Sequence, residues 1–99
     1  MGAIQIQSTT TTGAGAAYPC EPSRKTFQVT AVGTGTVTCS VDIEVSNNNN
    51  NWLKLATVAL NGATPQTDGF TADAPWAFYR ANPTSITAGS PTITTTMGF

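Results

Sequence analysis

The amino-acid sequence predicts an all-β protein, folded as an antiparallel β-sandwich with an extended N-terminal arm. Threonine accounts for 19 of the 99 residues, and β-branched side chains favour strands. Apolar and polar residues alternate through several segments, which is typical of strands with one buried face. Turn signals recur every eight to twelve residues or so, a spacing typical of sandwiches and barrels. About seven or eight strands are expected.

The N-terminal part, residues 1–17, is predicted to hold one short strand and a flexible arm, followed by a sandwich domain over residues 18–99. Residues 3–7 alternate, so that Ile4 and Ile6 share one face. Residues 8–17 read STTTTGAGAA and contain no large side chain to bury. This composition indicates a flexible connector or an extended arm.

The clearest strands lie in the middle of the chain. Residues 26–32 and 36–45 alternate, and the second segment places five apolar residues on one face: Val37, Cys39, Val41, Ile43 and Val45. The intervening Gly33–Gly35 predicts a turn. A short glycine-containing connection between two strands favours a hairpin.

Five consecutive asparagines at 47–51 predict a loop tip, because asparagine tolerates left-handed backbone. Residues 52–60 are predicted to form the next strand. Its alternation breaks between Leu55 and Val58, which a β-bulge would explain. A short helix is the alternative, since leucine and alanine favour helix.

The dipeptides Asn61-Gly62 and Asp68-Gly69 predict turns, and residues 70–75 a turn-rich link. The aromatic segment 76–81 is expected to be a strand that Asn82-Pro83 ends.

Beyond it, residues 84–87 are expected to form a short strand and 88–90 a turn. Residues 91–99 alternate again and place Ile93, Met97 and Phe99 on one face of a closing strand.

The charge content argues against several classes of function. The chain has no histidine, four basic and five acidic residues, and a net charge of −1. Histidine is the commonest acid–base catalyst near neutral pH, and a serine triad requires one, so we do not expect an enzyme. The scattered cations do not form the cluster that binds nucleic acid, and no apolar run reaches the roughly 20 residues of a membrane span.

A nearly neutral surface favours association, and the alternative is a monomer with a Thr/Asn/Ser surface. The N-terminus shows no secretory signal, which favours synthesis in a cytoplasm. Cys39 is expected to be a buried small hydrophobe. A Cys20–Cys39 disulfide is the alternative that a reducing compartment disfavours. Two cysteines without histidine cannot complete a zinc site, so no metal or cofactor is expected.

Three side chains stand out as binding candidates. Arg80 could clamp a carboxylate or a carbonyl across a subunit contact. Alternatively its stem stacks on Trp76 or Tyr79, with the charged head in water. Trp52 and Trp76 could form a carbohydrate platform, although core and rim packing is the commoner use of tryptophan.

The second half of the chain resembles small virion proteins of tailed bacteriophages. The resemblance rests on Trp52–Leu55, Asp68–Phe70, Ala74–Asn82, Thr84–Thr87 and the threonine-rich last strand. It implies a jelly-roll-like sandwich that serves as a capsid decoration (cement), fibre or neck component, commonly a trimer, without catalytic residues. An N-terminal arm that adds a strand to a neighbour fits such a role.

The sequence is therefore interpreted as that of a virion structural protein, most concretely a capsid decoration protein made in the host cytoplasm. Its expected partners are further copies of itself, as a homotrimer, and a major capsid protein or another virion protein. The alternative is a carbohydrate-binding or adhesion module of a phage fibre, and a hydrolase is a weaker third hypothesis. The residues expected at interfaces are Ile4, Ile6, Trp76, Arg80, Met97 and Phe99.

Overall fold

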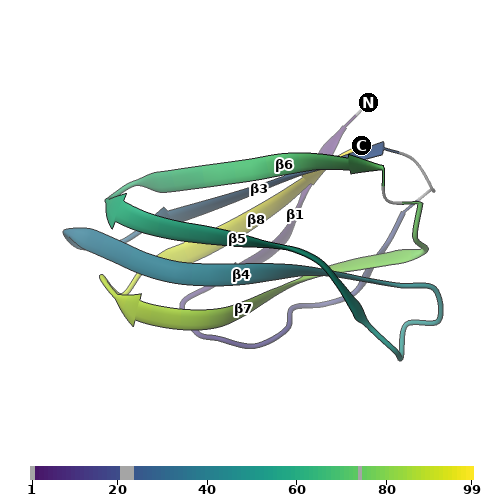
Figure 1. The fold of residues 1–99 in the computed structure, drawn as a ribbon, viewed down its shortest axis with the longest axis horizontal. Helices are drawn as coiled ribbons and strands as arrows, with labels where there is room; N and C mark the ends of the chain where they lie inside the picture. Colours follow the sequence, from purple (N-terminus) through teal and green to yellow (C-terminus); the bar gives the residue numbers. More distant parts are fainter. Residues whose placement is uncertain (1, 21–23, 74) are drawn as a thin grey trace.

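The chain forms two antiparallel four-stranded sheets, as the sequence predicts for an all-β protein (Figure 1). The structure is a computed structural model that describes residues 2–20, 24–73 and 75–99. The described residues contain eight strands and no helix. The strands are β1 (Ala3–Thr9), β2 (Tyr18–Pro19), β3 (Arg24–Val32), β4 (Thr36–Ser46), β5 (Leu53–Ala63), β6 (Gln66–Asp73), β7 (Phe78–Ala88) and β8 (Thr92–Gly98).

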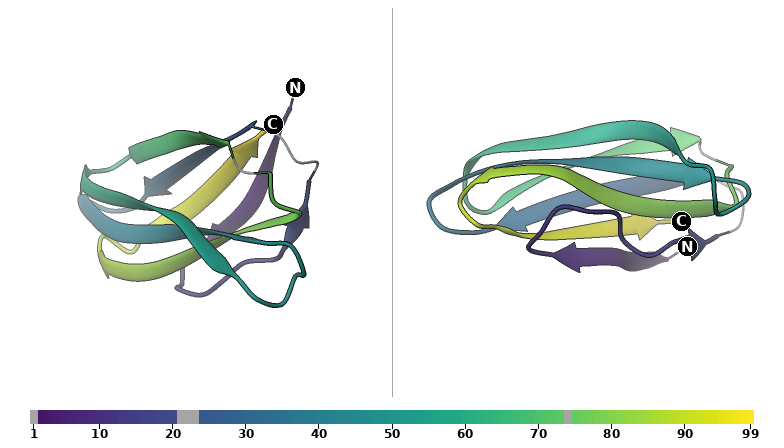
Figure 2. Two further views of the ribbon diagram at one scale, coloured as in Figure 1. Left: turned by 45° about the vertical axis from the view of Figure 1, so that its right-hand side comes forward. Right: turned by 90° about the horizontal axis from the view of Figure 1, so that it is seen from below.

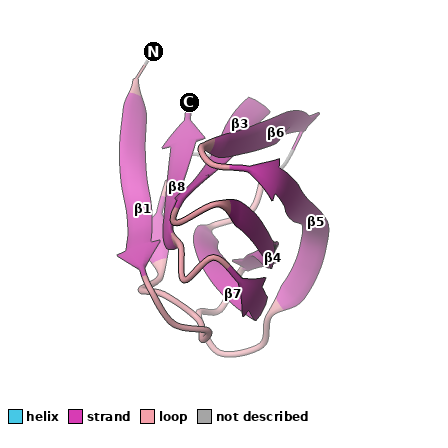
Figure 3. Cartoon of the chain, turned by 90° about the vertical axis from the view of Figure 1, so that its left-hand side faces the viewer, coloured by secondary structure: helices cyan, strands magenta, loops and turns pink. Residues whose placement is uncertain are grey.

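The order of the strands is symmetric along the chain. Sheet I has the order β1-β8-β3-β6 and sheet II the order β2-β7-β4-β5. Strand β1 pairs with β8, β2 with β7, β3 with β6, and β4 with β5. The chain therefore runs as one long antiparallel ribbon, doubled back at the β4–β5 loop and rolled into two layers (Figure 3).

The core lies between the two sheets, because the inward side chains of both are apolar. In β3 and β4 every second residue is buried, as the alternation predicts. Phe27 of sheet I contacts Tyr79 of sheet II, with 6.2 Å between ring centroids, and Phe70 at 5.2 Å. The wholly buried Lys25 places its amino group 5.4 Å from the centroid of the Tyr79 ring. These contacts join the layers through an aromatic cluster.

The predicted hairpin between β3 and β4 is wrong. The two strands belong to different sheets, and Gly33–Gly35 carries the chain from one layer to the other (Figure 2). The Thr34 amide donates to the Gly89 carbonyl at 2.9 Å, which ties this connection to the β7–β8 connection instead. An alternating pattern shows that a strand has one buried face, but it does not distinguish a hydrogen-bonded neighbour from a strand in the facing sheet.

Strand β4 forms its hairpin with β5, through the asparagine loop. Ser46 Oγ accepts hydrogen bonds from the amides of Asn48 and Asn49, which closes the loop that the sequence predicts. The register shifts where Ile43 opposes Ala56 and Glu44 opposes Lys54. The expected strand with a β-bulge is confirmed, and the helix alternative is wrong.

Two predicted turns are wrong as well. Asn61-Gly62 lies inside β5 and Asp68-Gly69 inside β6, while the chain changes direction at the cis Thr64-Pro65 peptide. Gly69 instead allows β6 to lie very close to β3, because a Cβ there would lie 2.2 Å from the Phe27 carbonyl oxygen. Glycine occurs both in turns and where two strands lie very close together, so a glycine dipeptide alone does not distinguish a turn from a strand.

Strand β7 is longer than predicted and starts later. It begins at Phe78, leaving Trp76 outside, and continues through Asn82-Pro83 to Ala88. The pairing with β4 shifts between Ser40 and Val41, where Val41 opposes Pro83. A bulge is one of the few places where a sheet tolerates proline.

The described residues of the predicted N-terminal strand and arm lie against the sandwich. Strand β1 is an edge strand of sheet I. In the segment that follows it, the amides of Gly13 and Gly15 donate to the carbonyls of Pro83 and Ala81 at 2.9 and 2.8 Å. The segment thus extends the edge of sheet II along β7.

Candidate docking surfaces

The outer face of sheet II carries a cluster of polar and aromatic side chains, here called the Arg80 cluster: Trp52, Arg80, Glu44 and Asn82. Arg80 Nε donates to Glu44 Oε1 at 2.6 Å, and Asn82 Nδ2 donates to Glu44 Oε2 at 3.2 Å. The Arg80 guanidinium lies over the Trp52 ring, 4.2 Å from its centroid. Strand pairing produces this arrangement, because Glu44 on β4 directly opposes Arg80 on β7.

The cluster differs from both expectations for Arg80. The carboxylate that Arg80 binds belongs to its own chain, and the ring beneath it is Trp52 rather than Trp76 or Tyr79. The Arg80 and Glu44 side chains are 24% and 15% exposed, so the pair is partly shielded from water. An ion pair stacked on an aromatic face forms a rigid polar patch with a planar group at its centre.

Trp76 has a structural environment. It packs against the core from a partly buried position, and its amide donates to Tyr79 Oη at 3.2 Å. The neighbouring Ala77 amide donates to Asn47 Oδ1 at 3.2 Å, which joins the segment before β7 to the asparagine loop. Within residues 2–20, 24–73 and 75–99, Trp76 and Trp52 form no aromatic ring pair, and the group stacked on Trp52 is the Arg80 guanidinium instead.

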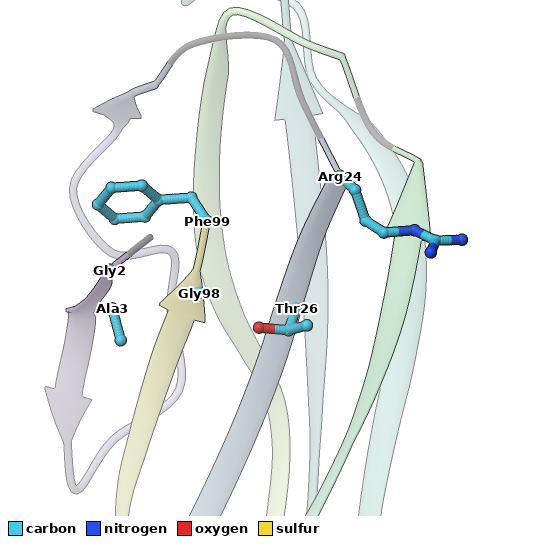
Figure 4. Close-up of a pocket in the computed structure, with 6 residues that line it drawn as sticks. All are labelled: Gly2, Ala3, Arg24, Thr26, Gly98 and Phe99. Carbon is cyan, nitrogen blue, oxygen red and sulfur yellow. The ribbon is translucent and has the colours of Figure 1, made fainter.

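The second surface is a hollow beside the first and last strands, here called the terminal hollow. It has a volume of about 550 Å³ and is lined by Gly2, Ala3, Arg24, Thr26, Gly98 and Phe99. Figure 4 shows the Phe99 ring beside Gly2, whereas Arg24 extends away from the ring on the opposite side. Three of the six lining residues, Gly2, Ala3 and Gly98, have little or no side chain and are here called the floor of the hollow, whose exposed lining is mostly apolar.

Two of the residues that line the terminal hollow are glycines with close neighbours. A Cβ at Gly98 would lie 2.2 Å from Thr26 Oγ1, and one at Gly2 would lie 3.1 Å from the Phe99 ring. The backbone hydrogen bonds between β1 and β8 continue beside the hollow, between Gly2 and Phe99. The Gly2 amide donates to the Phe99 carbonyl at 2.7 Å, and the Phe99 amide donates to the Gly2 carbonyl at 2.8 Å.

The structure divides the six expected interface residues into three groups. Ile4 and Phe99 are exposed, at 39% and 48%, and lie near the terminal hollow. Ile6 and Met97 belong to the core, at 2% and 1% exposed, so their side chains face the chain's own interior. Arg80 lies on β7 of sheet II and Trp76 lies just before that strand, so neither belongs to the terminal strands.

Two further carboxylates have local hydrogen-bond partners. Asp42 accepts a hydrogen bond from Thr57 Oγ1 at 2.6 Å, and Asp68 accepts one from the Gly69 amide at 2.8 Å. Within residues 2–20, 24–73 and 75–99, no three histidine, cysteine or acidic residues gather in a way that could hold a metal ion.

Both cysteines are free. Cys39 is buried, and burial raises the pKa of its thiol above the ordinary value of 9.0. The expectation of a small buried hydrophobe at this position is confirmed.

Sequence reasoning missed Glu44 and Asn82 as partners of Arg80, and it missed the glycine floor of the terminal hollow. The Glu44–Arg80 contact follows from the register between β4 and β7, which are separated by two other strands along the chain. The spacing of residues along the sequence carries no signal for such a register. The small residues at both termini were the available signal for the hollow.

No helix in the part of the chain that the structure describes is long and apolar enough to cross a membrane. Comparisons with models of protein families, with curated proteins and with solved structures found no match.

Proposed function

We propose that this chain is a structural component of a virus particle and that its fold is a jelly roll. The observation that carries the proposal is the strand order, in which β1 pairs with β8 and each following strand with its mirror-image counterpart. Rolling one antiparallel ribbon gives this order, and eight-stranded jelly rolls recur in viral capsid and lectin domains. The resemblance of residues 52–99 to phage virion proteins points the same way.

The two surfaces supply contacts of the kind that such a role needs. The terminal hollow is apolar, and the exposed Phe99 and Ile4 lie near it. The Arg80 cluster offers a planar cation and a carboxylate on a broad sheet face. With a net charge of −1, long-range repulsion between copies is small. Docking against protein, rather than bond chemistry, is therefore the proposed mode of action.

In the most specific form of the proposal, the protein decorates a capsid, binding the major capsid protein and further copies of itself. The resemblance implies a trimer. The mass of the purified protein in solution, measured by light scattering, tests this stoichiometry directly.

The decisive experiment asks whether the chain is a regular component of particles. Particles from the source culture are purified on a density gradient, and their proteins are quantified by mass spectrometry. We expect this chain at a fixed copy number per major capsid protein, and gold-labelled antibodies on the shell in electron micrographs. Absence from intact particles would refute the role, and labelling of the tail alone would move it from the head.

A carbohydrate-binding module is the second candidate, because the Arg80 cluster combines the Trp52 ring with the Glu44 carboxylate and the Asn82 amide. Sugars are commonly bound by an aromatic face with amide and carboxylate groups around it. A glycan array followed by calorimetry tests this candidate. Sugar binding that Trp52→Ala abolishes, and that Trp76→Ala leaves intact, would favour it over a purely structural role.

A further inference from the structure

The four sheet edges differ in their protection against pairing with another strand. Natural proteins block such edges with charged residues, prolines and bulges. Strand β2 carries Pro19, β5 carries Lys54, and β6 carries Asp68 and Asp73. Strand β1 reads AIQIQST and contains neither a charged residue nor a proline. Its one protective device is the register shift between Gln5 and Gln7, which leaves Ala3–Gln5 regular.

The free hydrogen-bonding groups of this edge follow from the ladder with β8. Gly2 and Phe99 exchange both backbone hydrogen bonds. In an antiparallel pair such residues alternate with pairs whose peptide groups point outward. Since Ala3 opposes Gly98 and Gln5 opposes Thr96, the amides and carbonyls of Ala3 and Gln5 point away from β8. No described strand lies on that side (Figure 3).

The residue between these two is an exposed β-branched hydrophobe. Ile4 is on the inward side of sheet I but lies at its rim, and it is 39% exposed. The terminal hollow begins at the neighbouring Ala3, and Phe99 is exposed across the ladder. Open backbone groups and apolar side chains therefore coincide at the start of β1.

We propose that the β1 edge pairs with the β1 edge of a second copy of this chain, antiparallel, about a twofold axis at Ile4. In this register Ala3 of one copy opposes Gln5 of the other, and the two Ile4 side chains face each other. Both outward-pointing residues of each copy then gain hydrogen-bonded partners. The same patch serves both copies, as a closed twofold contact requires.

A second copy suits this edge better than a charged partner would. The segment is neutral throughout and β-branched at its centre, so its own sequence is the complement that it needs. Four strands from each copy would join into one continuous sheet, which protects the least guarded edge of the molecule. This inference rests on the proposed function as a docking protein and names one partner and one contact, with a twofold pair in place of the trimer that the resemblance implies.

Cross-linking tests the register. In the antiparallel arrangement Ile4 sits in a non-hydrogen-bonded pair with Cα atoms about 4.5 Å apart, within the range that a disulfide spans. The variant Ile4→Cys, in a Cys20→Ser background, should form a covalent dimer under mild oxidation. The control Val32→Cys carries its thiol at another exposed apolar position, 54% exposed on β3, and should remain monomeric on denaturing gels. Equal cross-linking of both variants, or none at Ile4, would overturn the register.

Light scattering tests the pair without a cross-link. The native chain should show twice its monomer mass at high concentration, and Ile4→Lys should weaken the pair at least tenfold, because it opposes two like charges. The control Leu53→Lys makes the same change at a residue 56% exposed on the β5 edge and should leave the pair intact. Near-ultraviolet circular dichroism verifies that both variants keep the native fold.

The outcomes separate this contact from the proposed function. A trimer, or a dimer that Ile4→Lys does not weaken, would overturn the twofold contact and leave the role in particles standing. A β1-paired dimer that is absent from particles would support the twofold contact and refute the role in particles.

Discussion

Arg80 shows how one side chain depends on planar geometry. Its guanidinium both binds Glu44 through Nε and stacks on Trp52. A lysine ammonium keeps the charge but has neither the flat face nor the fixed donors. The position therefore distinguishes two cations that are often treated as equivalent.

We expect Arg80→Lys to lower the free energy of unfolding by about 1 kcal/mol, because lysine keeps the charge but loses the flat stacking face and the fixed Nε donor. Urea denaturation at low salt measures it. The control Arg24→Lys alters an ion pair to Asp73 whose side chains are 70% and 81% exposed, and it should change nothing measurable. Equal effects at both positions would contradict the geometric argument.

Two buried groups make stability depend on pH in alkaline solution. Burial raises the pKa of the Cys39 thiol above 9.0. For the Tyr79 phenol, burial and the nearby Cys20 raise the pKa above 10.0, against a lowering by the Trp76 amide hydrogen bond. The folded chain therefore keeps protons that the unfolded chain releases, and stability falls as pH rises through this region.

Thermal unfolding should show a constant melting temperature from pH 7 to about 8.5 and a progressive decrease above pH 9. The variant Cys39→Ala removes one of the two groups and should reduce the slope. Iodoacetamide provides an independent readout at pH 9. It should label Cys39 only after urea is added, and labelling of Cys39 in the native protein would contradict the burial argument.

At the scale of single strands, β6 depends on the absence of a side chain. Gly69 lies so close to β3 that an added Cβ would meet the Phe27 carbonyl oxygen, a backbone atom that cannot rotate away. At Gly98 the obstructing atom is Thr26 Oγ1, which belongs to a side chain. The two glycines face different obstacles, although both lie in strands of sheet I.

Gly69→Ala should destabilise the fold by about 1–3 kcal/mol, the usual cost of overpacking, and should open β6 selectively in hydrogen exchange. Gly98→Ala should cost less, since Thr26 can change rotamer. A larger loss at Gly98 than at Gly69 would show that side-chain crowding, and not the backbone approach, dominates.

The strands themselves were largely predictable, and their partners were not. Alternation located β3, β4 and β8, because each buries one face over many residues. It failed for β6, an edge strand in which no residue is fully buried. Partner choice depends on which layer a strand joins, and a connection such as Gly33–Gly35 serves a hairpin and a crossing between layers equally well.

The candidate surfaces were predictable only in part. The sequence analysis expected Ile4, Ile6, Met97 and Phe99 at intersubunit contacts. Ile4 and Phe99 are exposed and available for such a contact, whereas Ile6 and Met97 lie in the core of their own chain. Ile6 lies two residues from Ile4, and Met97 two residues from Phe99, so alternation assigns each pair to one face of its strand. Only the position within the sheet decides which member is buried. Glu44 and Trp52 became partners of Arg80 through tertiary pairing, which no local pattern encodes.

At the scale of the whole molecule, the two layers are joined by the aromatic contacts of Phe27. This side chain is 1% exposed and reaches Tyr79 in the opposite sheet. Its removal therefore weakens the attachment between layers and not just one strand.

Phe27→Ala should lower the free energy of unfolding by about 3–5 kcal/mol, a large share of the stability of a typical domain. Chemical denaturation measures it, with Phe27→Leu as the conservative control and a smaller expected loss. If both layers still unfold in one transition at a lower midpoint, the contact supports the whole sandwich. Two separated transitions would show that the sheets are independent.

The pairing of β1 with β8 has a consequence for synthesis. A ribosome releases β1 before the other described strands, but its only partner among these, β8 at residues 92–98, leaves the exit tunnel after all of them. Until then the AIQIQST segment lacks its hydrogen-bonded partner strand, so sheet I closes late and through contacts distant in sequence, which are slow to form. A nascent chain halted before residue 92 should therefore expose an unpaired, uncharged strand to chaperones and to other nascent copies.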